Sequence, residues 1–183
     1  MFSASSVLPV PLLLAAVAFG GVWPWLALIY LTLFAFALDT LIGQMEVESE
    51  FPAAEGLSVA LACLHFVVLG AVVWRFGQGV ATAEAVGLFL ATGLYIGQIG
   101  NSNAHELIHR GRRSLFGLGK AVYISLLFGH HVSAHPLVHH RHVATPRDPN
   151  TARLGEGYYR FLIRAWTGSF RAGFKAERAR RKD

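Results

Sequence analysis

Eight of the nine histidines of this chain lie between positions 105 and 142. They fall into two clusters, His105-Glu-Leu-Ile-His109 and then His130, His131, His135, His139, His140 and His142. Imidazole is the commonest protein ligand for functional metals. Surface or pH-sensing histidines are the alternative, but they explain so dense a stretch poorly. The sequence therefore predicts half or more of a metal site.

Helical spacing allows five of these rings to reach one centre. His105 and His109 are four residues apart and share a helix face, as do His135 and His139, with His140 adjoining. Pro136 predicts a kink or a helix start within the second cluster. The single cysteine, Cys63, lies in an apolar run, so the metal must be held by nitrogen and oxygen ligands.

Two kinds of metal site remain open at this point. The first cluster satisfies HExxH, in which two histidines bind zinc and Glu106 is the general base of a peptidase. A zinc peptidase needs about one further ligand, which leaves the second cluster unexplained. A pair of irons that activates dioxygen without thiolates requires many nitrogen ligands and accounts for all five histidines.

Long apolar segments must position these residues. Hydrophobic residues make up 54% of the chain and charged residues 15%. Four apolar segments approach the length of a bilayer span, namely 7–19, 22–38, 57–74 and 80–100. The first two follow an N-terminus without basic residues, unlike a cleaved signal peptide. We predict an all-α integral membrane bundle with about four transmembrane helices and additional interfacial helices.

The charges are divided unevenly along the chain. Residues 1–103 contain one basic and six acidic residues, whereas residues 104–183 contain fifteen basic and five acidic residues. Beside apolar spans this asymmetry indicates membrane orientation, with the histidines on the cytoplasmic side, and we expect no nucleic-acid partner. We therefore divide the chain into a transmembrane region (1–103), a histidine region (104–157) and a basic amphipathic interfacial helix (158–183).

Several residues around the clusters have two interpretations. Asp39, at the end of the second span, is either a solvated helix end or a carboxylate that orients a metal-bound imidazole. His65 lies among apolar residues and is expected to be a packing residue. The segment 46–55 is expected to be a connecting loop. The segment 115–129 is apolar but too short and too polar for a confident span.

The residues of both clusters and the loop after them resemble a known family. His105-Glu-Leu-Ile-His109-Arg110, His135-x-x-x-His139-His140 and the run from Val143-Ala-Thr-Pro through Asp148-Pro to Gly155-Glu156 are similar to the first two histidine boxes of bacterial membrane alkane 1-monooxygenases, relatives of the membrane fatty acid desaturases and hydroxylases. Asp39, Gly43 and Asn101 also match family positions. Two residues depart from the pattern, Ala134 and Val138, where the family has glutamate and glycine.

The resemblance implies a desaturase-like fold and a non-haem di-iron enzyme of the bacterial inner membrane. It implies hydroxylation of the terminal carbon of alkanes that enter from lipid, with electrons from rubredoxin and its NAD(P)H-dependent reductase. The implied iron ligands are His105, His109, His135, His139 and His140, with Asp39, Asn101, Glu106 and Asp148 as supporting residues. The alternatives are an intramembrane zinc peptidase, a non-catalytic metal-binding membrane protein and a desaturase or hydroxylase acting on acyl chains.

The family pattern also implies that this chain is incomplete. Family members continue with two more spans, a further histidine and a third histidine box, none of which occurs before Asp183. The expectation from the sequence is an inactive or nearly inactive fragment.

Overall fold

The computed structural model describes residues 2–42 and 55–181, and within these ranges every regular element is helical. The predicted all-α class is confirmed. Gly43 and the predicted loop 46–55, except for Glu55, lie outside the described residues. The chain forms two compact units, residues 1–122 and 123–183, which are described separately below.

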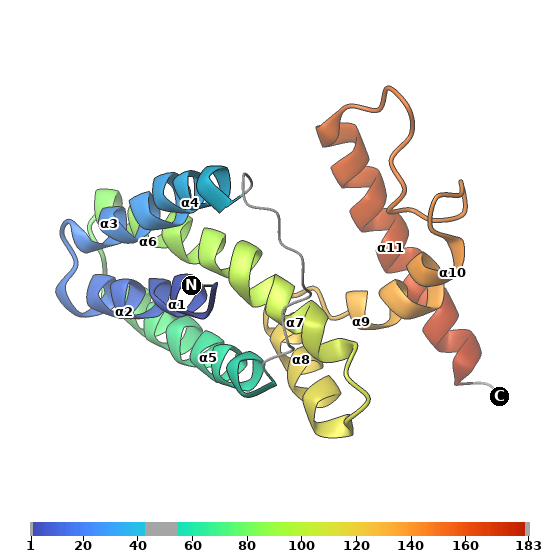
Figure 1. Cartoon of the computed structure of the whole chain (residues 1–183), viewed down its shortest axis with the longest axis horizontal. Helices are drawn as coiled ribbons and strands as arrows, with labels where there is room; N and C mark the ends of the chain where they lie inside the picture. The colour runs from blue at the N-terminus through green and yellow to red at the C-terminus, as the bar shows by residue number, and fades with distance from the viewer. Residues whose placement is uncertain (1, 43–54, 182–183) are drawn as a thin grey trace. The chain divides into compact units, whose positions relative to one another are not determined.

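The first unit consists of apolar helices that run back and forth (Figure 1). Its elements are α1 (Phe2–Val7), α2 (Pro9–Phe19), α3 (Trp23–Ile29), η1 (Tyr30–Phe34), α4 (Ala35–Ile42), α5 (Glu55–Gly77), α6 (Thr82–Tyr95), η2 (Ile96–Gly100), α7 (Asn101–Ile108) and most of α8 (Arg113–Ser125). The elements named η are π-helical, with backbone hydrogen bonds from residue i to residue i+5.

The core of this unit forms where α2, α3, α5 and α6 meet. Leu13, Leu88 and Tyr95 are completely buried there. Gly87 of α6 lies so close to α3 that a Cβ atom on it would be 3.1 Å from Pro24 and Trp25. Small residues at helix crossings allow this close approach, which is typical of helix packing in membranes.

Two helices are long and apolar enough to cross a membrane. They are α5 and the continuous helix Thr82–Ile108, while Ser5–Phe19 and Trp23–Ala37 form shorter apolar helices. Large apolar side chains on the outside of the unit are exposed, including Val73 and Trp74 of α5 and Phe89 of α6. Such a surface is unfavourable in water and suits lipid. The chain is a membrane protein, and the expected count of four spans stays a prediction.

One ion pair joins the ends of α5 and α6. Arg75, the single basic residue before position 104, binds Glu84 at 2.7 Å. The carboxylate of Glu84 also lies against Gly20, whose φ of +61° places it in the left-handed region that favours glycine. This pair therefore fixes the end of the first unit at which α5 ends and α6 begins.

Helix α8 packs against α7, which carries the first histidine pair. A Cβ atom on the buried Gly119 would lie 2.8 Å from the Cβ of Leu107 and 2.9 Å from the carbonyl oxygen of Ala104. Gly117, two residues earlier in the same helix, has no such neighbour. The two glycines therefore form a matched pair for testing the α7–α8 contact.

We expect Gly119→Ala to destabilise the protein by about 1–3 kcal/mol, because the added methyl group forces α7 and α8 apart. Gly117→Ala should be neutral or stabilising by up to about 1 kcal/mol, since alanine has the higher helix propensity. Thermal unfolding of the detergent-solubilised protein measures both effects. Equal midpoints for the two variants would contradict the packing described here.

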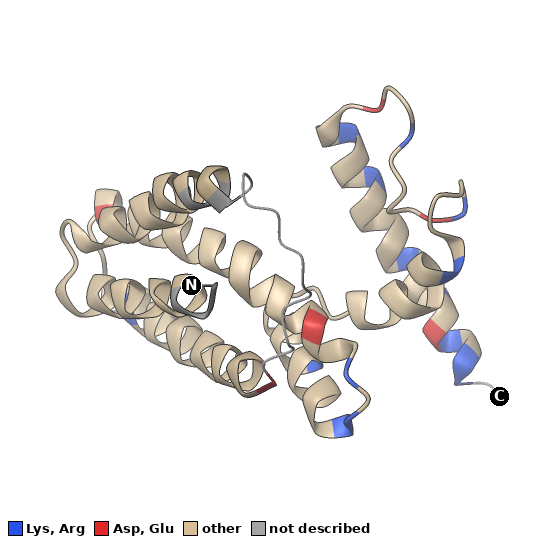
Figure 2. Cartoon of the chain, viewed as in Figure 1, with Lys and Arg blue, Asp and Glu red and all other residues tan. Residues whose placement is uncertain are grey.

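The second unit contains the second histidine cluster and one long helix. Its elements are α9 (His131–Ala134), η3 (His135–His139), α10 (His140–His142) and α11 (Tyr158–Arg180). Gly173 of α11 lies against Ala134, where a Cβ atom would be 2.9 Å from the alanine methyl group. Lysines and arginines recur along α11 (Figure 2). The predicted amphipathic helix is present over nearly the expected residues.

Candidate metal centre

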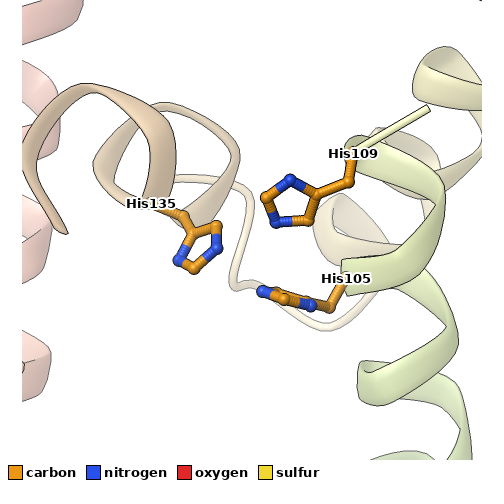
Figure 3. Close-up of side chains that lie close together, drawn as sticks. All are labelled: His105, His109 and His135. Atoms are coloured by element: carbon orange, nitrogen blue, oxygen red, sulfur yellow. The ribbon is translucent and has the colours of Figure 1, made fainter. Parts of the chain in front are cut away.

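The first histidine pair stands at the end of the longest apolar helix. His105 lies in the last turn of α7, and His109 ends that helix. Their ring centroids are 4.7 Å apart (Figure 3), as the spacing of four residues predicts. Asn103 ties this turn to α5, because its side-chain amide donates to the carbonyl oxygen of Ser58 at 2.9 Å.

A π-helical segment precedes this pair. In η2 the chain makes one wide turn between α6 and α7, so that the faces of α7 are rotated relative to those of α6. Gly100, the last residue of η2, is buried, and a Cβ atom there would lie 3.1 Å from Nδ1 of His65. His65 is 1% exposed within the apolar unit. This position suits the packing role predicted for it.

The second cluster is brought together by another π-helical turn. In an α-helix, residues five apart point about 140° away from each other, whereas the i to i+5 hydrogen bonds of a π-helix place them on one face. In η3 the Nε2 atoms of His135 and His140 are accordingly 2.8 Å apart. The ring of His139 stacks on that of His135, with centroids 5.3 Å apart. Pro136 lies within this turn, where a kink or helix start was predicted.

Asp148 orients the third ring of this group. Its Oδ2 atom lies 2.9 Å from Nδ1 of His139, and its side chain is completely buried. The same oxygen accepts the hydroxyl of Thr151 at 2.6 Å, and Oδ1 accepts the backbone N–H of Asn150 at 3.0 Å. An ionised carboxylate only accepts, so Nδ1 of His139 carries the proton and Nε2 is left as the metal-binding atom.

The environment of Asp148 favours its ionised form. Burial raises the pKa of this carboxyl, but the hydrogen bonds from Thr151, Asn150 and His139 outweigh burial and lower the pKa below its ordinary value. The carboxylate therefore remains charged at neutral pH. A buried charge held by three donors is a fixed support for an imidazole that binds a cation.

The donor set and its spacing fit a transition metal. A metal–nitrogen bond is about 2.0–2.1 Å long, so two nitrogens on one metal lie roughly 3 Å apart. The Nε2 atoms of His135 and His140 are 2.8 Å apart, close to that separation. Cys63, the one thiol of the chain, lies in the middle of α5 and is exposed on its surface. A nitrogen-rich site suits iron or zinc.

Three further histidines of the second unit have different surroundings. The ring of His131 stacks on those of Phe128 and His135, with centroids 5.0 and 4.9 Å apart. His130 lies between Phe128 and Phe170, and burial lowers its pKa. His142 ends α10. The sequence assigned no role to these three residues, and the aromatic contacts of the first two are those of packing residues.

The other predicted supporting residues lie on α7, which carries the first histidine pair, or on α4. Glu106 forms an ion pair with Arg110, one turn further along, and its side chain is about half exposed. Asn101 begins α7. Asp39 lies in α4, but its side chain is outside the described part of the structure. Their roles stay predictions, as does the sharing of one centre by all five histidines.

Arg164 and Thr151 were not predicted from the sequence, yet both support Asp148 or its loop. Nε of Arg164 donates to Glu156 at 2.7 Å, and Nη1 donates to the carbonyl oxygen of Pro149 at 2.9 Å. Arg164 shares a face of α11 with Arg160 and Arg171, so no signal in the sequence separated it from the other arginines of this helix. Thr151 belonged to the quoted family run without a role.

The ion pair between Arg164 and Glu156 makes a pH-dependent contribution to stability. The hydrogen bonds from Arg164 are the main reason why the pKa of Glu156 falls to about 2. Because the folded state lowers this pKa, the stabilisation is complete above the ordinary value of 4.5 and disappears as the pH falls towards 2. We expect the stability difference between wild type and Glu156→Gln to shrink over this pH range. Denaturant unfolding at several pH values measures it, and a constant difference would contradict the assignment.

Comparisons with known proteins relate the chain to one family. A model of the fatty acid desaturase family matches residues 80–182, which include both histidine clusters. An alkane 1-monooxygenase of Pseudomonas putida is 32% identical over 78% of this chain and 35% of its own length. Alkane 1-monooxygenase 2 of Pseudomonas aeruginosa is 30% identical over 87% of this chain and 46% of its own length. Alkane 1-monooxygenase 1 of Alcanivorax borkumensis is 30% identical over 87% of this chain and 42% of its own length.

This chain thus spans less than half the length of each of these three relatives. The similarity nevertheless extends over most of the chain and is not confined to the short HExxH motif. It distinguishes the chain from a zinc peptidase that shares only that motif. With more than half of its residues matched by the desaturase model, the chain belongs to the fatty acid desaturase family, together with the alkane 1-monooxygenases that it resembles.

Proposed function

We propose that the protein containing these 183 residues is a membrane non-haem iron monooxygenase that hydroxylates the terminal carbon of alkanes. One observation carries the proposal: a π-helical turn pairs His135 with His140, and Asp148 leaves Nε2 of His139 for a metal. This arrangement occurs in a chain whose curated relatives are named alkane 1-monooxygenases.

The proposed metal ligands are His105, His109, His135, His139 and His140. Two irons, when bound, supply the activation of dioxygen that allows one oxygen atom to be inserted into a C–H bond. The protein contributes fixed imidazoles, of which His139 is oriented by a buried carboxylate. The alkane substrate would enter from lipid, past the exposed apolar side chains of α5 and α6.

Metal content and product identity test this proposal. The protein that contains these 183 residues should hold iron after purification, and membranes that contain it, supplied with rubredoxin, its reductase and NADH, should convert octane into 1-octanol. Zinc without iron, together with proteolysis that Glu106→Gln abolishes, would support the peptidase. Unsaturated acyl chains without alcohol would support a desaturase, the second candidate suggested by the family model. Neither of these results is compatible with the proposal.

Electrons would arrive from rubredoxin on the basic end of α11. Arg178, Arg180 and Arg181 lie at this end of the helix, and their charges suit an acidic carrier. Glu177 binds both Arg180, at 2.7 Å, and Arg181, at 3.0 Å, and so neutralises part of that surface. Charge reversal at Arg178 should therefore slow reduction at low ionic strength more than reversal at either of its neighbours. Equal rates in all three variants would contradict this docking site.

The outer face of α11 would lie on the inner membrane surface, with the histidines on the cytoplasmic side. Two stripes of exposed residues run along this face. One is apolar and the other is basic. The apolar stripe is Tyr159, Ile163, Trp166, Phe170 and Phe174, and the basic stripe is Arg160, Arg171 and Lys175. Apolar and basic stripes side by side suit the acyl and headgroup layers of an anionic membrane.

Fluorescence of Trp166 tests this placement. In a variant with phenylalanine at the other three tryptophans, bilayers containing anionic brominated lipids should quench the emission. Changing Arg160, Arg171 and Lys175 to glutamine should reduce quenching at low salt, because it removes the attraction to headgroups. Unquenched emission in the bilayer would show that a protein surface covers this face, or that it is in water.

A further inference from the structure

Arg164 lies where α11 meets the loop that follows the second histidine cluster. Its side chain is 24% exposed and donates to three groups of that loop. These are the carboxylate of Glu156, the carbonyl oxygen of Pro149 at 2.9 Å and the carbonyl oxygen of Thr151 at 3.0 Å. The planar, forked guanidinium meets all three at once, which a lysine ammonium on a single flexible stem does not reproduce.

The two carbonyl groups bound by Arg164 belong to residues that are attached to Asp148, one through the chain and the other through a hydrogen bond. Pro149 follows Asp148 directly, and Thr151 donates its hydroxyl to Oδ2 of Asp148 at 2.6 Å. The hydroxyl of Thr151 also accepts the backbone N–H of Ala144 at 3.0 Å. Ala144 has a φ of +62°, which is strained for a residue with a Cβ atom. The loop therefore needs outside contacts to keep this conformation.

Two further contacts attach the same segment to α11. The hydroxyl of Ser169, 3% exposed, donates to the side-chain oxygen of Asn150 at 2.9 Å. Gly168 lies against Pro149, where a Cβ atom would be 2.7 Å from the proline ring. Residues 149–151 are thus fixed to α11 on both sides, and Asp148 is the next residue in the chain.

We infer that Arg164 is a positioning residue, which fixes Asp148 through this loop and thereby sets the tautomer and orientation of the His139 ring. Among the described residues of the second unit, its hydrogen bonds go to the loop at Pro149, Thr151 and Glu156, and the ring of His139 is held by Asp148. The inference rests on the proposed function only in treating His139 as a metal ligand. Removal of Arg164 would loosen residues 149–151, and Asp148 would no longer meet Nδ1 of His139 in one geometry.

Nitrogen NMR of the metal-free protein tests this directly. The full chain is labelled with ¹⁵N-histidine, and His139→Gln identifies the His139 signals. In the wild type, His139 should carry its proton on Nδ1. Arg164→Gln should shift it to a mixture of tautomers, because the carboxylate that selects Nδ1–H is no longer fixed. Arg164→Lys should also give a mixture of tautomers, since lysine keeps the positive charge but lacks the forked guanidinium group.

Arg147→Gln is the matched control, because Arg147 is an exposed arginine of the same loop. It should leave the His139 signals unchanged. As a second measurement, affinity for Co(II) should fall about 10-fold or more in Arg164→Gln and stay unchanged in the control. Circular dichroism confirms that each variant is folded. Because the NMR readout needs neither iron nor an alkane, it remains valid if hydroxylation is not observed.

Three results would overturn the inference. The first is a folded Arg164→Gln protein that keeps the Nδ1–H tautomer at His139. The second is a change of equal size in Arg147→Gln. The third is loss of the folded state in both Arg164 variants, which would make this arginine a determinant of folding and not of ring orientation. If Arg164→Gln loses the Nδ1–H tautomer but the protein that contains these 183 residues produces no alcohol from alkanes, the proposed function alone is refuted.

Discussion

Replacing His140 with alanine in the protein that contains these 183 residues is expected to reduce the proposed alkane hydroxylation by at least about 100-fold and to lower the iron content of the purified protein. His140 meets His135 across the π-helical turn with 2.8 Å between their Nε2 atoms, so its loss removes one of two ring nitrogens whose separation suits a shared metal. Loss of a proposed ligand should exceed the 10- to 100-fold effect typical of residues that only orient ligands.

His142→Ala is the control for this substitution. His142 lies two residues further along α10, carries the same side chain and is not among the five predicted ligands. It should keep both activity and iron content. Iron is measured on the purified protein and 1-octanol on intact membranes, so a folding defect is distinguished from a defect of the site. Normal iron content in His140→Ala would remove this residue from the ligand set.

Changing Asp148 to asparagine is expected to have the second largest effect. The carboxylate accepts from His139, Thr151 and Asn150, and an amide group presents a donor where one of those donors now points. A buried donor left unsatisfied costs about 1–3 kcal/mol. The proton of the neutral His139 ring would no longer be held on Nδ1, and we expect metal affinity to fall about 10- to 100-fold.

Thr151→Val gives an intermediate case, because it removes one hydrogen bond and keeps the charge of Asp148. Its metal affinity should lie between those of the wild type and Asp148→Asn. Titration with Co(II) followed by visible absorption measures all three proteins. Wild-type affinity in Asp148→Asn would mean that this carboxylate does not orient a ligand.

Local pattern and composition predicted much of the fold and the first half of the site. Long apolar segments predicted the helices of the first unit, because bilayer spans require them. The four-residue spacing of His105 and His109 gave their ring contact, since both lie on one helix face. The amphipathic pattern after Gly157 predicted α11, which begins at Tyr158.

The second half of the site could be predicted only in part. The sequence identified His135, His139 and His140, at spacings of four and five residues, as residues that could reach one centre. The structure stacks the ring of His139 on that of His135, and it also brings the Nε2 atoms of His135 and His140 together, because η3 adopts the wider hydrogen-bond register. Asp148 was one of four possible supporting residues, and its hydrogen bond to His139 depends on how the loop folds back.

The sequence by itself therefore determined which residues have the chemistry to bind a metal and that apolar helices carry them, because residue type and short-range periodicity are local properties. The tertiary structure decided which nitrogens meet, which imidazole is held by a carboxylate and that Arg164 fixes this loop. Those features arise from a helix register and a loop conformation that depend on the packing of α9 and η3 against α11, and contacts between residues distant in sequence leave no local pattern.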